Sequence, residues 1–84
     1  MRLLIVDDEH YIVNYLAALV EAHAPEDLEV YKCYSGMEAL ELSKTMKIHL
    51  ALLDIRMPGL SGIETASRIR TSDPDFRVIF LICL

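Results

Sequence analysis

Short apolar runs alternate along the chain with longer segments that carry helix signals. Two runs, Leu3–Val6 and Leu50–Leu53, are too short for helices and fit buried strands. The segment Leu28–Tyr34 alternates imperfectly and carries Lys32, as an edge strand can, and Val78–Leu84 is predicted to be the last strand. Pro25 and the turn Asp73-Pro74-Asp75 separate helical segments from the strands that follow them. The pattern predicts the element order β-α-β-α-β-α-β.

Two kinds of signal predict the helices. Apolar residues recur at helical spacing over about Glu9–His23, at Tyr11, Ile12, Tyr15, Leu16, Leu19 and Val20. The segments Ser35–Glu38 and Ser61–Glu64 each have the Ser-Gly-x-Glu pattern of a capping box. In such a box the serine accepts a backbone N–H bond and the glutamate reaches back to the serine N–H. We predict that the two helices starting there end at about Lys47 and Arg70.

Strands that alternate with helices predict a single α/β domain, a doubly wound parallel sheet with helices on both faces. In such a sheet ligands bind beyond the carboxyl ends of the strands, where the strand order reverses. The first strand ends in Asp7-Asp8 and the third ends in Asp54. The strand order 2-1-3-4 makes these strands neighbours, so this order brings the three carboxylates together.

Three adjacent carboxylates need either a proton or a cation. A pair of like charges about 4 Å apart repels by roughly 4 kcal/mol at an effective dielectric constant near 20. Carboxylate oxygens with few other ligands suit Mg²⁺, which keeps several waters and readily shares a phosphate. A carboxylate such as Asp54 can also attack phosphorus as a nucleophile.

Composition excludes several classes of function. The chain has 84 residues, 54% of them apolar, and a net charge of −5 without any basic run, so nucleic-acid binding by this segment is disfavoured. Its longest uncharged apolar run is too short to span a bilayer, and the acidic N-terminus does not resemble a signal peptide. Cys33 and Cys83 lack a metal-like spacing. We therefore expect a reduced cytoplasmic protein, and the predicted strand order keeps the two cysteines too far apart for a disulfide.

Three segments, "LLIVDDE", "LLDIRMPGLSGIE" and "VIFL", resemble the receiver domain of bacterial two-component response regulators. The resemblance implies a flavodoxin-like fold in which Asp54 is the phosphoacceptor. It also implies that Asp7, Asp8 and Asp54 hold Mg²⁺ together with the backbone carbonyl of Arg56. The phosphoryl donor would be a sensor histidine kinase, and the module would turn over no metabolite, so we expect no enzyme.

The sequence departs from the family pattern in two respects. At about Ile82, where the family has a Ser or Thr, the residue is apolar. A family lysine that follows a fifth strand has no counterpart, and we expect residues 1–84 to form a partial receiver domain without helix 4, strand 5 and helix 5. Its last strand, "VIFLICL", has no charge, Pro or Gly, which predicts self-association through strand 4.

Two other functions stay open. A pseudo-receiver that acts only by protein association is consistent with both departures from the family pattern. An aspartate-nucleophile phosphatase is the other alternative, but such enzymes need a second aspartate two residues after the nucleophile. Residue 56 is arginine, which disfavours this activity.

Overall fold

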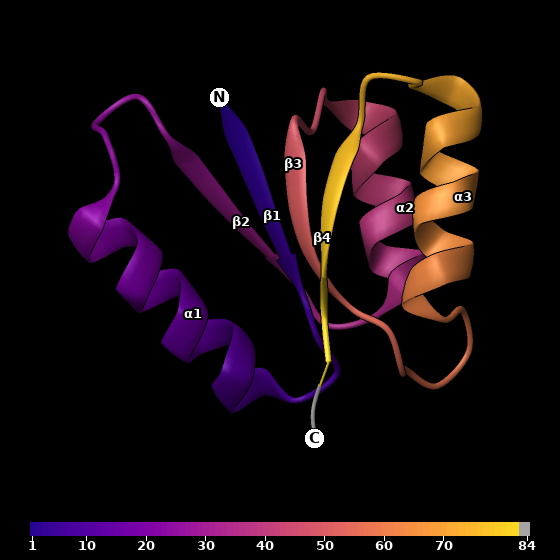
Figure 1. Cartoon of the computed structure of the whole chain (residues 1–84), viewed down its shortest axis with the longest axis horizontal. Coiled ribbons are helices and arrows are strands. Elements are labelled where there is room, and N and C mark those ends of the chain that lie inside the picture. Colours follow the sequence, from indigo (N-terminus) through magenta and orange to yellow (C-terminus); the bar gives the residue numbers. More distant parts are fainter. Residues whose placement is uncertain (83–84) are drawn as a thin grey trace.

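The computed structural model describes residues 1–82, and the seven elements follow the predicted order (Figure 1). They are β1 (Arg2–Val6), α1 (His10–His23), β2 (Glu29–Cys33), α2 (Gly36–Thr45), β3 (Leu50–Asp54), α3 (Gly62–Ser72) and β4 (Arg77–Leu81). Strand β2 is shorter than predicted by one residue at each end, and the Leu28 N–H instead bonds to the Pro25 carbonyl in a turn. Helix α2 ends at Thr45, before the predicted Lys47, because Met46 adopts an extended backbone.

The last strand begins at Arg77 and ends at Leu81, so its predicted extension through Ile82 is wrong. The remainder of that prediction, and the prediction about a Cys33–Cys83 disulfide, concern residues 83–84 outside the described part of the chain.

All strand pairs are parallel and the order is β2-β1-β3-β4, which confirms the predicted doubly wound sheet. Helix α1 lies on one side of the sheet, and α2 and α3 lie together on the other (Figure 1). Val6 pairs with Leu53, and Asp54 pairs with Leu81. Asp7, which follows Val6, therefore lies beside Asp54 at the end of β3, and Asp54 lies beside Leu81 at the end of β4.

Strand β1 forms the centre of the core. Leu4, Ile5 and Val6 are completely buried, because helices cover both faces of this strand. One cluster packs on the side of α2 and α3 and includes Leu4, Val6 and Phe76, whereas Ile5 packs against α1. The strand that leads into Asp7 is therefore fixed on both sides.

The apolar face predicted for α1 is only partly correct. The helix buries Val13 and Ala17, whose small side chains allow close approach to the sheet, with Leu16 packed beside them. Tyr11, Tyr15 and Leu19 belong to the apolar residues that recur at helical spacing, but they are 69%, 66% and 46% exposed. The helix carries two adjacent apolar stripes, and the described part of the sheet covers only one of them.

The two capping boxes differ. At α3 both bonds form, since the Glu64 N–H donates to Ser61 Oγ and the Ser61 N–H donates to Glu64 Oε1. At α2 the Glu38 N–H donates to Ser35 Oγ at 3.1 Å, but among the described residues no return bond from Glu38 is formed. Ser35 has a more extended backbone (φ −156°) than Ser61 (φ −67°), which reorients its N–H. That half of the prediction is wrong.

Candidate functional site

Three carboxylates meet at the carboxyl end of the two central strands. Asp7 directly follows β1 and Asp54 ends β3, the strand beside it. One oxygen from each of Asp7, Asp8 and Asp54 lies within 4.8 Å of the other two. The structure thus brings together the acids that the sequence placed at neighbouring strand ends.

Backbone hydrogen bonds fix two of these carboxylates. The Glu9 N–H donates to Asp7 Oδ1 at 3.0 Å, and the Arg56 N–H donates to Asp54 Oδ1 at 3.3 Å. Each bond closes a local turn in which an aspartate accepts from the residue two positions ahead. Asp7 is buried and Asp54 half-buried, whereas Asp8 is exposed. The site therefore has two oriented acids and one that can move.

The electrostatics of the site favour a proton or a cation. Burial raises the pKa of Asp7 above its ordinary value, and the hydrogen bond from the Glu9 backbone opposes that rise. The negative charges of Asp54 and Asp8 raise this pKa further. Bound Mg²⁺ would relieve the same repulsion, and a set of three carboxylate oxygens suits this hard cation. The residues present therefore fit a magnesium ion.

The loop after β3 closes tightly on Asp54. The Gly62 N–H donates to the Ile55 carbonyl at 2.9 Å, and the Ile55 N–H donates to the Leu81 carbonyl at 3.3 Å. A Cβ atom added to Gly62 would lie 2.1 Å from the Asp54 carbonyl oxygen. Glycine at this position thus allows helix α3 to start directly against the end of β3. This close approach was not recognised from the sequence, although the Ser-Gly pair that opens α3 is visible there.

An open hollow of about 470 Å³ surrounds the exposed side of the acids. It is lined by Asp8, Glu9, Asp54, Ile55, Arg56, Leu81 and Ile82. The wall formed by Leu81 and Ile82 is apolar. Sequence reasoning missed Leu81, which the pairing of Asp54 with Leu81 in the sheet brings to the site. Arg56 places its N–H on Asp54 as described, and its carbonyl as a metal ligand stays a prediction.

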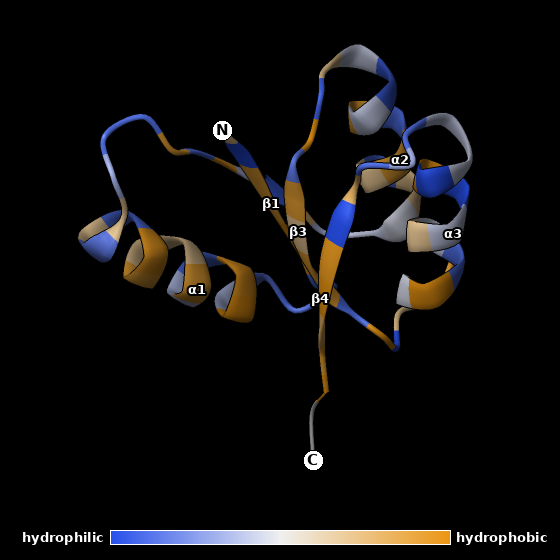
Figure 2. Ribbon diagram, turned by 45° about the horizontal axis from the view of Figure 1, so that its top comes forward, coloured by the Kyte–Doolittle hydropathy of each residue, from blue (hydrophilic) through white to orange (hydrophobic). Residues whose placement is uncertain are grey.

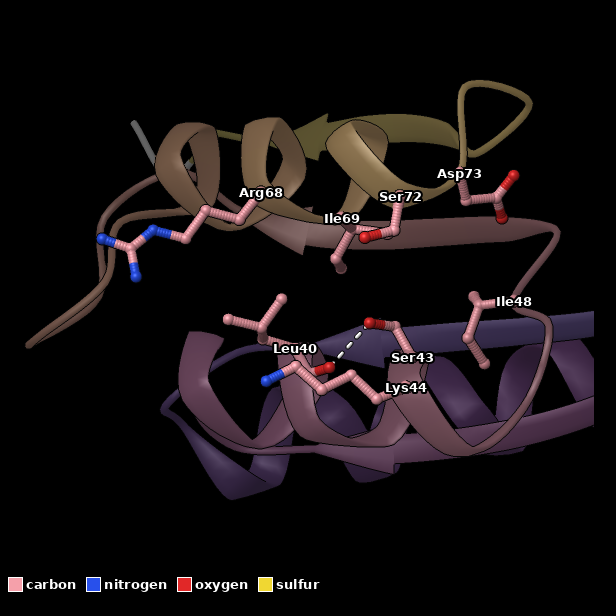
Figure 3. Close-up of a pocket in the computed structure, with 8 residues that line it drawn as sticks. All are labelled: Leu40, Ser43, Lys44, Ile48, Arg68, Ile69, Ser72 and Asp73. Atoms are coloured by element: carbon pink, nitrogen blue, oxygen red, sulfur yellow. Dashed lines mark hydrogen bonds between the residues drawn. The ribbon is translucent and has the colours of Figure 1, made fainter.

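A second, smaller cavity of about 70 Å³ lies between α2 and α3. Leu40 and Ile69 point toward each other across it (Figure 3). Two of its polar groups are already bonded, because Ser43 Oγ donates to the Leu40 carbonyl and Asp73 accepts from Lys47 Nζ. The acidic hollow is therefore the better candidate for a functional site.

Comparison with known proteins agrees with this geometry. Residues 3–82 match the family model described as the response regulator receiver domain. The chain belongs to this family. It is 46% identical over 70 residues to regulatory protein VanR of Enterococcus faecium, a match that covers 82% of this chain and 29% of VanR. It is 34% identical over 80 residues to sporulation initiation phosphotransferase F of Bacillus subtilis, covering 95% of this chain and 62% of that protein.

The structure of response regulator TrrA from Thermotoga maritima in complex with Mg²⁺ and BeF is similar to this receiver chain. The TM-score is 0.83 at 37% identity, and the match covers 94% of this chain and 66% of TrrA. The chain thus spans less than two-thirds of the curated relatives named above. It has the flavodoxin-like receiver fold. Among residues 1–82, no helix is both long and apolar enough to cross a membrane.

Proposed function

We propose that this chain is a phosphoacceptor module of two-component signalling, which accepts a phosphoryl group on Asp54 from a sensor histidine kinase in the cytoplasm. The observation that carries the proposal is the meeting of Asp7, Asp8 and Asp54 within 4.8 Å at the end of β1 and β3. The family membership supports it, and TrrA, which is similar in fold, is described in complex with Mg²⁺ and BeF.

In the proposed reaction, a carboxylate oxygen of Asp54 forms a new bond to phosphorus. The bond between phosphorus and the donor atom, a histidine nitrogen of the kinase, breaks, and the leaving group keeps its electron pair. Asp54 Oδ1 already accepts the Arg56 N–H, so the other oxygen is available for attack. The turn holds the carboxylate in one orientation, which favours attack from a defined direction.

The site would hold Mg²⁺ through Asp7, Asp8 and Asp54 and the backbone carbonyl of Arg56. When bound, this ion supplies charge neutralisation for the transferred phosphoryl group. The protein contributes the fixed orientation of Asp7 and Asp54 through their backbone hydrogen bonds. Exposed Asp8 can adjust to the ion.

Incubation with acetyl phosphate and Mg²⁺, followed by intact mass spectrometry, tests the proposal. We expect one added phosphoryl group on the wild-type chain and none on Asp54→Asn. Continuous release of phosphate from a phosphate monoester over many turnovers would instead indicate a phosphatase. A folded wild-type chain that acetyl phosphate and other small phosphoryl donors leave unlabelled would refute the proposal and favour a pseudo-receiver.

We also propose that residues 1–84 self-associate through β4. This strand lies at the edge of the sheet, and the Arg77 N–H and Leu81 carbonyl bond toward β3. Since alternate residues of a parallel strand bond to the same neighbour, the backbone groups of Val78 and Phe80 face away from β3. Figure 2 shows that β4 is apolar along most of its length, and Ile79 is 53% exposed.

Light scattering on a size-exclusion column tests this second proposal. Phe80→Lys should shift the chain toward monomer, because a charge on an exposed edge opposes pairing with another strand. Met37→Lys, at an exposed position on α2, is the matched control and should leave the distribution unchanged. A wild-type monomer at tens of micromolar would refute self-association.

A further inference from the structure

The acidic hollow contains one positive charge of its own. Among the described side chains that line it, Arg56 is the sole basic one, beside Asp8, Glu9 and Asp54. Several other basic side chains of the described residues are engaged elsewhere, in the pairs Arg2–Glu29, Lys32–Asn14, Lys44–Glu41, Lys47–Asp73 and Arg70–Phe76. Arg68 lines the other cavity, between α2 and α3.

The backbone of Arg56 is fixed, but its guanidinium is not. The Arg56 N–H bonds to Asp54 Oδ1, and the preceding residue, Ile55, is bonded through both its N–H and its carbonyl. The side chain is exposed, and within residues 1–82 its guanidinium forms no hydrogen bond or ion pair, although it shares the hollow with three acids. The backbone of Arg56 is thus held in place, and within residues 1–82 its positively charged guanidinium is available to bind an anion in the hollow.

A phosphoryl group on Asp54 would bring further negative charge into a hollow that already holds Asp8 and Glu9. Leu81 and Ile82, which also line the hollow, have no side-chain donor for the oxygens of the phosphoryl group. A guanidinium offers a planar fork of N–H donors that matches the oxygens of a phosphoryl group in both charge and geometry.

We propose that the guanidinium of Arg56 binds the oxygens of a phosphoryl group carried by Asp54. This inference rests on the proposed phosphoacceptor function, and it assigns the side chain a role separate from that of the backbone carbonyl. The alternative is that Arg56 only neutralises the negative charge of the unphosphorylated acids. In that case its removal would strengthen Mg²⁺ binding and would leave the binding of a phosphoryl mimic in saturating Mg²⁺ unchanged.

The test compares wild type with Arg56→Ala, Arg56→Lys and the control Arg68→Ala, another exposed arginine. Beryllofluoride, added in saturating Mg²⁺ and followed by ¹⁹F NMR, serves as the phosphoryl mimic, and Mg²⁺ alone is titrated separately. We expect Arg56→Ala to weaken beryllofluoride binding about tenfold, or ~1.4 kcal/mol. Arg56→Lys should recover part of the loss, and Arg68→Ala should match wild type. Mg²⁺ should bind Arg56→Ala at least as tightly as wild type.

The outcomes separate the two proposals. Equal beryllofluoride affinity in wild type and Arg56→Ala would overturn the role of Arg56 and leave the phosphoacceptor function intact. A parallel loss of Mg²⁺ affinity in Arg56→Ala would also overturn it, because the side chain would then act on the metal site. A wild-type chain that binds Mg²⁺ but takes up no beryllofluoride would overturn both.

Discussion

Replacing Gly62 with alanine tests whether the loop after β3 sets the position of Asp54. The new Cβ would lie 2.1 Å from the Asp54 carbonyl oxygen and 3.0 Å from the Ile55 Cα, whereas ordinary van der Waals contact begins at 3.4 Å. Both opposing atoms belong to the backbone, so no rotation of a side chain can relieve the contact. The start of α3 and the end of β3 must separate by more than an ångström.

The cost of this separation follows from the contacts it breaks. Forced overpacking costs about 1–3 kcal/mol, and loss of the bond from the Gly62 N–H to the Ile55 carbonyl costs about 1 kcal/mol more. Alanine recovers up to about 1 kcal/mol as a better helix former than glycine. We expect a net loss of about 1–4 kcal/mol in the free energy of unfolding, together with weaker Mg²⁺ binding, because Asp54 moves relative to Asp7.

Gly59→Ala is the matched control. Gly59 has φ +76°, and no atom of residues 1–82 lies within 4 Å of an added Cβ, so alanine there costs about 1–2 kcal/mol in backbone strain alone. Urea unfolding measures both losses, and a Mg²⁺ titration followed by chemical shifts reports the site. If Gly62→Ala, fully folded, bound Mg²⁺ as tightly as Gly59→Ala, the loop would not position Asp54 and the reasoning would be refuted.

Three further outcomes can be measured. Asp54→Asn should weaken Mg²⁺ binding, measured by the same titration. If Mg²⁺ changed the chemical shifts of the wild-type chain only in regions away from β1 and β3, the metal site would be contradicted. Hydrogen bonding to Lys47 lowers the pKa of Asp73 below its ordinary value of 3.8. The pair therefore stabilises the folded chain fully above about pH 4, and this stabilisation is lost as the pH falls through the lowered pKa of Asp73. Lys47→Met should therefore destabilise the chain near neutral pH in urea titrations, with a difference from wild type that shrinks below about pH 4; a constant difference would count against the pair. Burial raises the pKa of Cys33 to about 12, so alkylation of Cys33 at pH 8, measured by peptide mass mapping that separates it from Cys83, should be slow until urea unfolds the chain. Rapid labelling of Cys33 in the native chain would show that β2 opens.

The strand order and the acidic cluster could be predicted from sequence for a simple reason. Each buried strand is a short apolar run that ends in an acid or a turn, and few topologies suit strands that alternate with helices. Once β1 and β3 are neighbours, Asp7 and Asp54 have to meet, because parallel strands end at the same edge. The position of these residues thus depends on topology, which the pattern specifies well.

Features that depend on the exact fit between elements could not be predicted in this way. The helical spacing of apolar residues assigns Tyr11 and Tyr15 to an apolar face of α1. It cannot show which of two adjacent apolar stripes the sheet covers. The patterns at Ser35 and Ser61 are the same, yet the boxes differ because the backbone enters the two helices at different angles. The close approach of Gly62 to Asp54 likewise depends on a path of the loop that no periodicity encodes.

The site divides into fixed and movable groups, and this division suggests an order of binding. Asp7 and Asp54 are held by backbone bonds, whereas Asp8 and Arg56 are exposed. With the acids ionised, an anion entering first would meet the repulsion of all of them, so the cation should bind first and reduce it. Beryllofluoride should therefore bind wild type measurably only when Mg²⁺ is present, and binding of equal strength in its absence would show that the acids do not control entry to the hollow.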